Sequence, residues 1–126
     1  MNAQSNSSAE SVVQRQLDAY NAKDIDALMT VYAEDAQQFE HPSKLLASGT
    51  GEIRPRFEAR FKEPNLHAQL VKRIVSGDIV IDQEIVSRTF PEGTGKIELV
   101  AIYEVKNARI DRAWFISGEK TMDSTK

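Results

Sequence analysis

The sequence predicts an α+β domain in which a sheet wraps around helices. In the first half of the chain, apolar residues recur every three or four positions, which is the period of a helix that buries one face. After Asn65 the period falls to two, and short turns separate the apolar runs, which indicates antiparallel strands. The length of 126 residues suits one domain. We expect a flexible start at 1–8, a folded domain at 9–120 and a flexible end at 121–126.

Two amphipathic helices are expected first. Ser7 and Glu10 fit a capping box, in which the two side chains satisfy free amides at a helix start. The helix that follows, over roughly 9–22, shows apolar residues at helical spacing, namely Val13, Leu17 and Tyr20. Asp24 is suited to cap a second, short helix that carries Ile25, Leu28, Met29 and Tyr32.

Two short strands and a third helix come next. Pro42 disfavours helical geometry at His41, so we expect one short strand at 39–41 and another at 44–47. Gly49 to Gly51 then opens a helix with Ile53, Phe57 and Phe61 on one face. Arginines and glutamates alternate along this helix, a mixed pattern that is typical of a solvated surface.

Four long strands are expected in the second half, at 66–76, 79–90, 96–106 and 109–118. For the hairpin closed by 91–95 we assume that Phe90 faces Lys96, which places Arg88 opposite Glu98 as an exposed ion pair. The inner face then carries Ile81, Gln83, Ile85, Ser87, Ile97, Leu99, Ala101 and Tyr103. The outer face carries Asp82, Glu84, Val86 and Arg88, and a one-residue slip would exchange the faces.

The last strand is apolar on both faces, since Ala113 and Phe115 alternate with Trp114 and Ile116. One face belongs to the core, and the other needs a further partner. We therefore expect a homodimer through Val100, Ile102, Trp114 and Ile116.

Composition excludes several classes of function. With 16 Lys and Arg against 19 Asp and Glu, the net charge is −3, so we expect no nucleic-acid partner. The sequence has no cysteine for thiolate chemistry, and no apolar stretch approaches the roughly 18 residues of a membrane helix. His41 and His67 lack a third inward ligand for a metal. A cytoplasmic protein without metal, cofactor or membrane partner is expected.

A family resemblance is carried by the run from Leu17 to Ala36, LDAYNAKDIDALMTVYAEDA, by the helix of Ile53 and Phe57, and by residues 101–115. These segments resemble the nuclear-transport-factor-2-like superfamily, in its SnoaL-like and ketosteroid-isomerase-like branch. The resemblance implies a cone, in which three N-terminal helices pack into a curved, mainly antiparallel sheet. It also implies a ligand cavity at the open end and dimerisation through the outer face.

The catalytic sets of characterised relatives are not retained. The isomerase base position, just before the proline, aligns with His41, while the partner tyrosine and acid positions align with Gln16 and Ala101. The Asp–Arg–Asp set of epoxide-hydrolase-like relatives falls near Ile85, Gln83 and Phe115. The resemblance therefore indicates the fold more strongly than the chemistry.

His41 is the leading catalytic candidate, because an imidazole moves protons near neutral pH. The alternative is a structural histidine at a strand end. The expected ligand-binding residues are Phe39, Gln83, Ile85, Leu99, Ala101, Tyr103 and Phe115. Gln83 and Tyr103 offer polar groups inside the cone, or they bond to each other. Charged residues, Glu84 included, are expected to lie outside the cavity.

Three hypotheses remain open. The first is a cofactor-independent, isomerase- or cyclase-like acid–base enzyme acting on a small hydrophobic cyclic substrate. The second is a non-catalytic binder of such a molecule, and the third is a protein-interaction scaffold, which predicts a filled cone.

Overall fold

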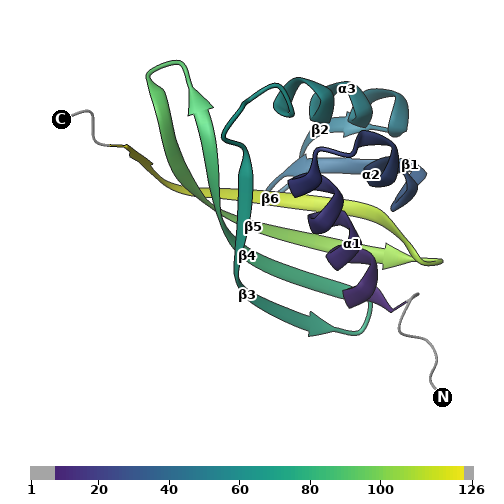
Figure 1. Ribbon diagram of the computed structural model, residues 1–126. Helices are drawn as coiled ribbons and strands as arrows, with labels where there is room; N and C mark the ends of the chain where they lie inside the picture. The colour runs from purple at the N-terminus through teal and green to yellow at the C-terminus, as the bar shows by residue number, and fades with distance from the viewer. Residues whose placement is uncertain (1–7, 124–126) are drawn as a thin grey trace.

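The computed structural model describes residues 8–123, which form three helices and one six-stranded sheet (Figure 1). The elements are, in order, α1 (Ala9–Ala22), α2 (Ile25–Thr30), β1 (Tyr32–Glu40), β2 (Lys44–Ser48), α3 (Thr50–Arg60), β3 (His67–Ser76), β4 (Ile79–Phe90), β5 (Gly93–Lys106) and β6 (Arg109–Met122). The strand order is β2-β1-β6-β5-β4-β3, with β1 and β6 parallel and the other neighbours antiparallel. This arrangement confirms the predicted α+β cone.

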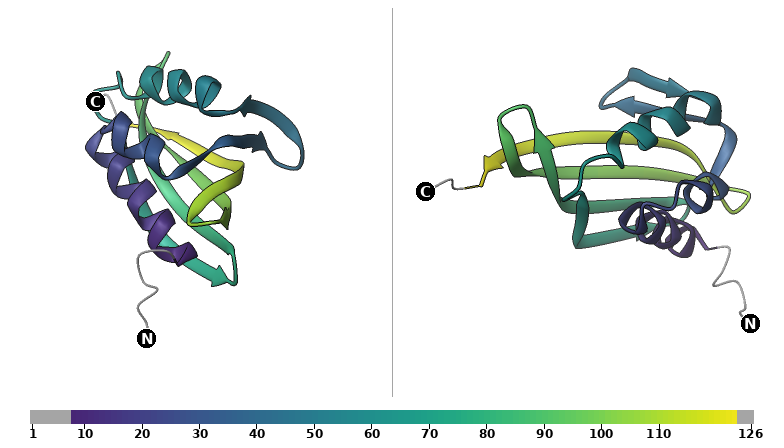
Figure 2. Two further views of the ribbon diagram at one scale, coloured as in Figure 1. Left: turned by 90° about the vertical axis from the view of Figure 1, so that its right-hand side faces the viewer. Right: turned by 45° about the horizontal axis from the view of Figure 1, so that its top comes forward.

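The helices cover one face of the curved sheet, and the β1–β2 hairpin projects at the sheet edge next to β6 (Figure 2). The core lies between the helices and the sheet, and its large, fully buried side chains come from both: Val12, Val13, Leu28, Ile53, Val80 and Ile110. A second, smaller cluster joins α1 to β3 and β4 through Leu17, Leu66, Ala68 and Val86. This smaller cluster lies beside the cavity described below.

The first helix is capped one residue later than predicted. The Ser8 side chain accepts a hydrogen bond from the Ser11 amide at 3.1 Å, whereas Ser7 lies outside the described residues. The helix ends at Lys23, which adopts a left-handed conformation with φ of 56°. A serine side chain therefore caps the helix as expected, but it is the neighbouring one, and Ser11 occupies the position that the predicted capping box gave to Glu10.

The first strand is longer than predicted. It begins at Tyr32, which therefore belongs to β1 and not to the second helix. Phe39 pairs with Trp114 of β6, and the two rings stack with centroids 5.7 Å apart. The following strand β2 and helix α3 were both predicted. At the other end of the chain, β6 continues through Thr121 to Met122, into the stretch expected to be flexible.

The predicted register of the β4–β5 hairpin is wrong. Phe90 pairs with Gly93, three residues before Lys96, because the turn consists only of Pro91 and Glu92. Gly93 has a φ of 134°, a conformation that glycine adopts without strain. A shift by an odd number of residues exchanges the faces of one strand.

Strand β4 is therefore turned over relative to the prediction. Asp82 and Glu84 face the helices and are 0% and 4% exposed, whereas Gln83 is exposed on the outside. Arg88 pairs with Gly95 and not with Glu98, so the expected exposed ion pair does not form. The faces predicted for β5 are correct, and Leu99, Ala101 and Tyr103 point inward opposite Glu84, Asp82 and Val80.

Candidate active site

A cavity of about 350 Å³ lies between the helices and the inner face of the sheet. This volume is at the lower end of the range of small-molecule sites, about 300–1,000 Å³. Apolar side chains from α1, α3 and the three strands β4, β5 and β6 form much of its wall: Leu17, Phe57, Val86, Ile97, Leu99 and Phe115. The cavity therefore suits a compact ligand with an apolar ring.

Four buried polar side chains interrupt this apolar lining: Gln16, Gln38, Glu84 and Tyr103. The Tyr103 hydroxyl donates a hydrogen bond to Gln16 Oε1 at 3.3 Å. Burial, followed by repulsion from Glu84, raises the pKa of Tyr103 well above its usual value. The phenol thus stays protonated and remains a hydrogen-bond donor at neutral pH.

Glu84 is the buried carboxyl group of the cavity lining. Among residues 8–123 its carboxyl group makes no hydrogen bond or ion pair. Burial raises its pKa to about 7, repulsion from Asp82 adds to the shift, and attraction to Arg73 opposes it. Both protonation states of Glu84 are therefore populated near neutral pH.

The neighbouring Asp82 explains why Glu84 has no cation of its own. Arg73 Nε and Nη2 donate to the two Asp82 carboxylate oxygens at 2.7 and 3.0 Å, and Arg73 Nη1 donates to Gln14 Oε1 at 2.8 Å. Asp82 and Glu84 are two residues apart on β4, so both point inward. The guanidinium is thus engaged by Asp82, by Gln14 and by the Glu10 carboxylate, which lies 3.9 Å from Nη1.

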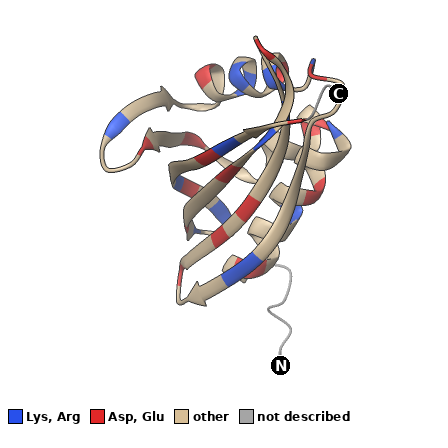
Figure 3. Cartoon of the chain, turned by 90° about the vertical axis from the view of Figure 1, so that its left-hand side faces the viewer, with Lys and Arg blue, Asp and Glu red and all other residues tan. Residues whose placement is uncertain are grey.

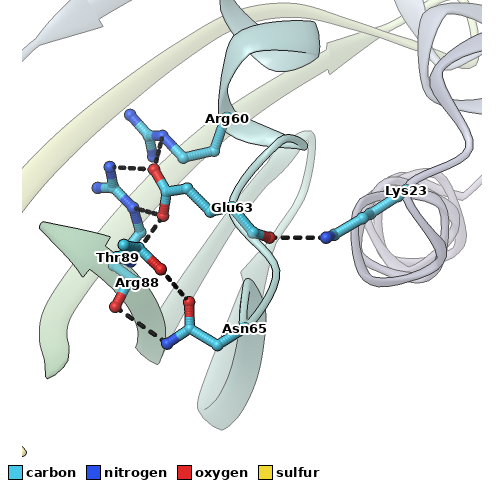
Figure 4. A network of polar contacts seen from close by, with 6 residues as sticks. All are labelled: Lys23, Arg60, Glu63, Asn65, Arg88 and Thr89. Atoms are coloured by element: carbon cyan, nitrogen blue, oxygen red, sulfur yellow. Dashed lines mark hydrogen bonds and ion pairs between the residues drawn. The ribbon is translucent and has the colours of Figure 1, made fainter. Parts of the chain in front are cut away.

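Arginines surround the mouth of the cavity: Arg56, Arg60 and Arg88. Glu63 holds two of them (Figure 4). Arg88 donates to both Glu63 carboxylate oxygens at 2.8 and 2.7 Å, and Arg60 Nε lies 3.7 Å away from one of them. Burial opposes ionisation of Glu63, but hydrogen bonds from Arg88 and the Thr89 amide lower its pKa overall.

Comparison with known proteins identifies the family. Residues 13–113 match the SnoaL-like domain family. The chain belongs to this family. The resemblance to the SnoaL-like family is thereby confirmed. No curated protein sequence matches this SnoaL-like chain.

Solved structures share the fold of this SnoaL-like domain. An uncharacterised cystatin-fold protein from Novosphingobium aromaticivorans has a TM-score of 0.80 at 24% identity, over 86% of this chain and 97% of that one. A putative ketosteroid isomerase from Kribbella flavida has a TM-score of 0.76 at 11% sequence identity, over 97% of this chain and 86% of that one. A putative polyketide cyclase from Sinorhizobium meliloti has a TM-score of 0.68 at 24% sequence identity, over 82% of this chain and 92% of that one. At these identities the likeness shows the fold alone.

The SnoaL-like chain brings only part of the predicted site together. Leu99, Tyr103 and Phe115 line the cavity, while Ala101 is fully buried in the core without lining it. Phe39 lies against Trp114, which is turned away from the cavity, and the register correction turns the other two expected residues outward, Gln83 and Ile85.

His41 is exposed in the turn between β1 and β2 and does not line the cavity. Its backbone amide donates to the Phe115 carbonyl at 2.9 Å. This contact anchors the turn on β6 and leaves the imidazole outside.

Charged residues were expected outside the cavity, and this expectation is wrong for Glu40, Arg56, Arg60, Glu84 and Arg88. Figure 3 shows both signs alternating along α3, the pattern that suggested a solvated helix. The signal for Arg56 and Arg60 was their spacing of four residues on either side of Phe57, which places them on one side of the helix, where Arg56 is exposed and Arg60 is half-buried at the edge of the cavity. Among the described residues, no group of three His, Asp or Glu side chains is placed to hold a metal ion.

Proposed function

We propose that this SnoaL-like chain is an acid–base enzyme in which Glu84 moves a proton on a small, largely apolar ligand in the cavity. The supporting observation is the buried Glu84 carboxyl group, which lines the cavity without a partner among residues 8–123. A general base works best when its pKa lies near the working pH. The pKa of about 7 for Glu84 meets this condition.

A ligand with a hydrogen on the carbon next to a carbonyl group suits this arrangement. The Glu84 carboxylate takes that proton, and the electron pair moves onto the carbonyl oxygen to form an enolate. Gln16 and Tyr103 both line the cavity, and the Tyr103 hydroxyl, which donates to Gln16 Oε1 in the free protein, turns to the ligand to stabilise the developing negative charge together with the Gln16 amide N–H. In a ligand whose next carbons carry a double bond, the enolate is a dienolate, and return of the proton from Glu84 to its far carbon completes an isomerisation. In a ligand with a second carbonyl group, the enolate carbon attacks that carbonyl, and the alkoxide that forms takes the proton back from Glu84, which completes a cyclisation.

In this function Glu84 takes the proton-transfer role that was expected of His41, and the reaction needs no cofactor. It agrees with the names of two similar structures, a putative ketosteroid isomerase and a putative polyketide cyclase. The open cavity is an argument against a scaffold with a filled cone. A binder without catalysis is the remaining alternative, and the following experiment separates it from an enzyme.

The test uses 5-nitrobenzisoxazole, a small neutral aromatic compound that reports on a desolvated base. Removal of its C3 proton breaks the N–O bond and releases a coloured cyanonitrophenolate. We expect acceleration over buffer with a rate that rises with pH through about 7, because the carboxylate is the active form. Glu84→Gln should reduce the rate by at least about a hundredfold.

His41→Ala is the matched control and should keep the rate of the native protein, since the imidazole lies outside the cavity. Circular dichroism establishes that each variant is folded. An equal rate in native protein and Glu84→Gln, or a loss confined to His41→Ala, would show that Glu84 is not the base. No acceleration by native protein would favour the binder.

Two further parts of the proposal concern the whole protein. The outer face of the sheet, with Val100, Ile102, Trp114 and Ile116, is proposed as the homodimer interface. A cytoplasmic location is proposed as well, to be tested by cell fractionation. Within the described residues, no helix is both long and apolar enough to cross a membrane.

A further inference from the structure

Arg56 differs from the other arginines at the mouth of the cavity. Arg88 and Arg60 share the Glu63 carboxylate. Arg56 donates from Nε to the buried Gln38 Oε1 at 3.3 Å, and it has no carboxylate partner among residues 8–123. Its two Nη groups are therefore available to a ligand.

The surroundings of Arg56 concentrate positive charge at this point. Burial lowers the pKa of Arg56, and repulsion from Arg60 lowers it further, although a guanidinium remains protonated in proteins. Besides Glu63, which Arg88 binds, the mouth has the exposed carboxylate of Glu40, whose Oε1 lies 3.8 Å from Lys44 Nζ in the β1–β2 hairpin. The acidic groups of the mouth are thus engaged by other cations, and Arg56 is not neutralised.

The position of Arg56 relative to the cavity selects the shape of the ligand. Arg56 and Phe57 are neighbours on α3, and both line the cavity. A molecule with its charge on Arg56 places its apolar part against Phe57 and the facing wall of Val86 and Leu99. The planar fork of a guanidinium matches the two oxygens of a carboxylate.

We infer that the cavity takes small aromatic or alicyclic carboxylic acids, whose carboxylate binds Arg56 at the mouth while the ring lies in the apolar interior. The inference rests on the proposed function for the reactive end of the molecule, which then faces Glu84. It adds a substrate class, and a specificity-determining residue, to that site.

The experiment compares indole-3-acetate with its uncharged analogue indole-3-acetamide by isothermal titration calorimetry. Native protein should bind the acid at least about tenfold more tightly, because a charge-assisted bidentate contact is lost with the amide. Arg56→Gln should bring the ratio close to one, and Arg56→Lys should retain part of the preference because it keeps the charge.

Arg54→Gln is the matched control. It removes one cation from the same helix, but Arg54 pairs with Asp26 and Glu58 at 2.8 and 3.0 Å and does not line the cavity. This variant should keep the preference of the native protein. If long-range charge alone were responsible, Arg54→Gln and Arg56→Gln would lower the ratio equally, which would overturn the inference.

Equal binding of acid and amide by native protein would also overturn it, as would a preference that survives in Arg56→Gln. Failure of both compounds to bind with a Kd below about 1 mM would count against it as well. These failures are separate from a failure of the proposed function, because 5-nitrobenzisoxazole carries no charge and its conversion reports on Glu84 alone.

Discussion

At the scale of single residues, the chemistry of this SnoaL-like chain depends on two inward carboxylates of β4, of which only one is paired with an arginine. Asp82 takes Arg73 in a bidentate ion pair, and Glu84 is left without a cation. A buried carboxylate in this position favours its neutral form. Ionisation of Glu84 in the folded protein therefore costs free energy, and this cost makes the stability of the protein depend on pH.

The free energy of unfolding should fall as pH rises from about 4.5 to about 7, compared with Glu84→Gln. The pKa of Glu84 is raised from 4.5 to about 7 on folding, so the folded protein binds more protons than the unfolded chain in this range. The full difference is about 3 kcal/mol. Urea denaturation at several pH values measures it.

Glu119→Gln, which removes an exposed carboxylate from β6, is the control and should keep the pH dependence of the native protein. If Glu84→Gln and native protein lost stability in parallel over this range, Glu84 would not be the group responsible. The raised pKa would then have no support in solution.

At the scale of elements, the β4–β5 hairpin decides which residues enter the site. Its two-residue turn carries the strands on to Gly95, which lies against β6. A Cβ added at Gly95 would lie 2.7 Å from the Thr121 carbonyl oxygen, so the two strands approach closely only because this residue has no side chain.

Gly95→Ala should therefore destabilise the protein by about 1–3 kcal/mol, because the clash is with backbone and not with a mobile side chain. Thermal and urea denaturation measure the change. Gly51→Ala in α3 is the contrasting variant, since a Cβ there meets nothing within 4 Å. It should be neutral or stabilising by up to about 1 kcal/mol. Equal effects of the two substitutions would contradict the close approach.

The sequence predicted this hairpin without its register. The run from Pro91 to Gly95 contains two glycines, and both a five-residue loop and a two-residue turn agree with it. The alternation of apolar and polar residues in β4 is compatible with either turn, because Ile81 and Ile85 lie on one face of the strand and Val80 and Val86 lie on the other. The buried ion pair of Asp82 with Arg73 makes the polar face the inner one, and no local signal marked that pairing.

At the scale of the whole molecule, the outer face of the sheet remains to be covered. It carries Trp114 beside Phe39, and Ile116 is 39% exposed. An apolar face of this kind favours association with a second copy, as the proposed homodimer requires.

Ile116→Glu should convert a dimer of the native protein into a monomer, because it places a charge in the proposed interface. Sedimentation velocity measures the change, and an unaltered urea midpoint at low protein concentration excludes unfolding as its cause. Lys106→Glu, at the exposed end of β5, should leave the assembly unchanged. A native protein that sediments as a monomer would rule out this interface.

The sequence by itself determined the class and order of the elements, because periodicity and turn residues are local properties of the chain. It also carried the family resemblance, and with it the expectation of a cavity. The tertiary structure decided which side chains face that cavity. Glu84, Arg56 and Arg88 enter it, and His41, Gln83 and Ile85 do not, because strand register and burial depend on pairings between residues distant along the chain.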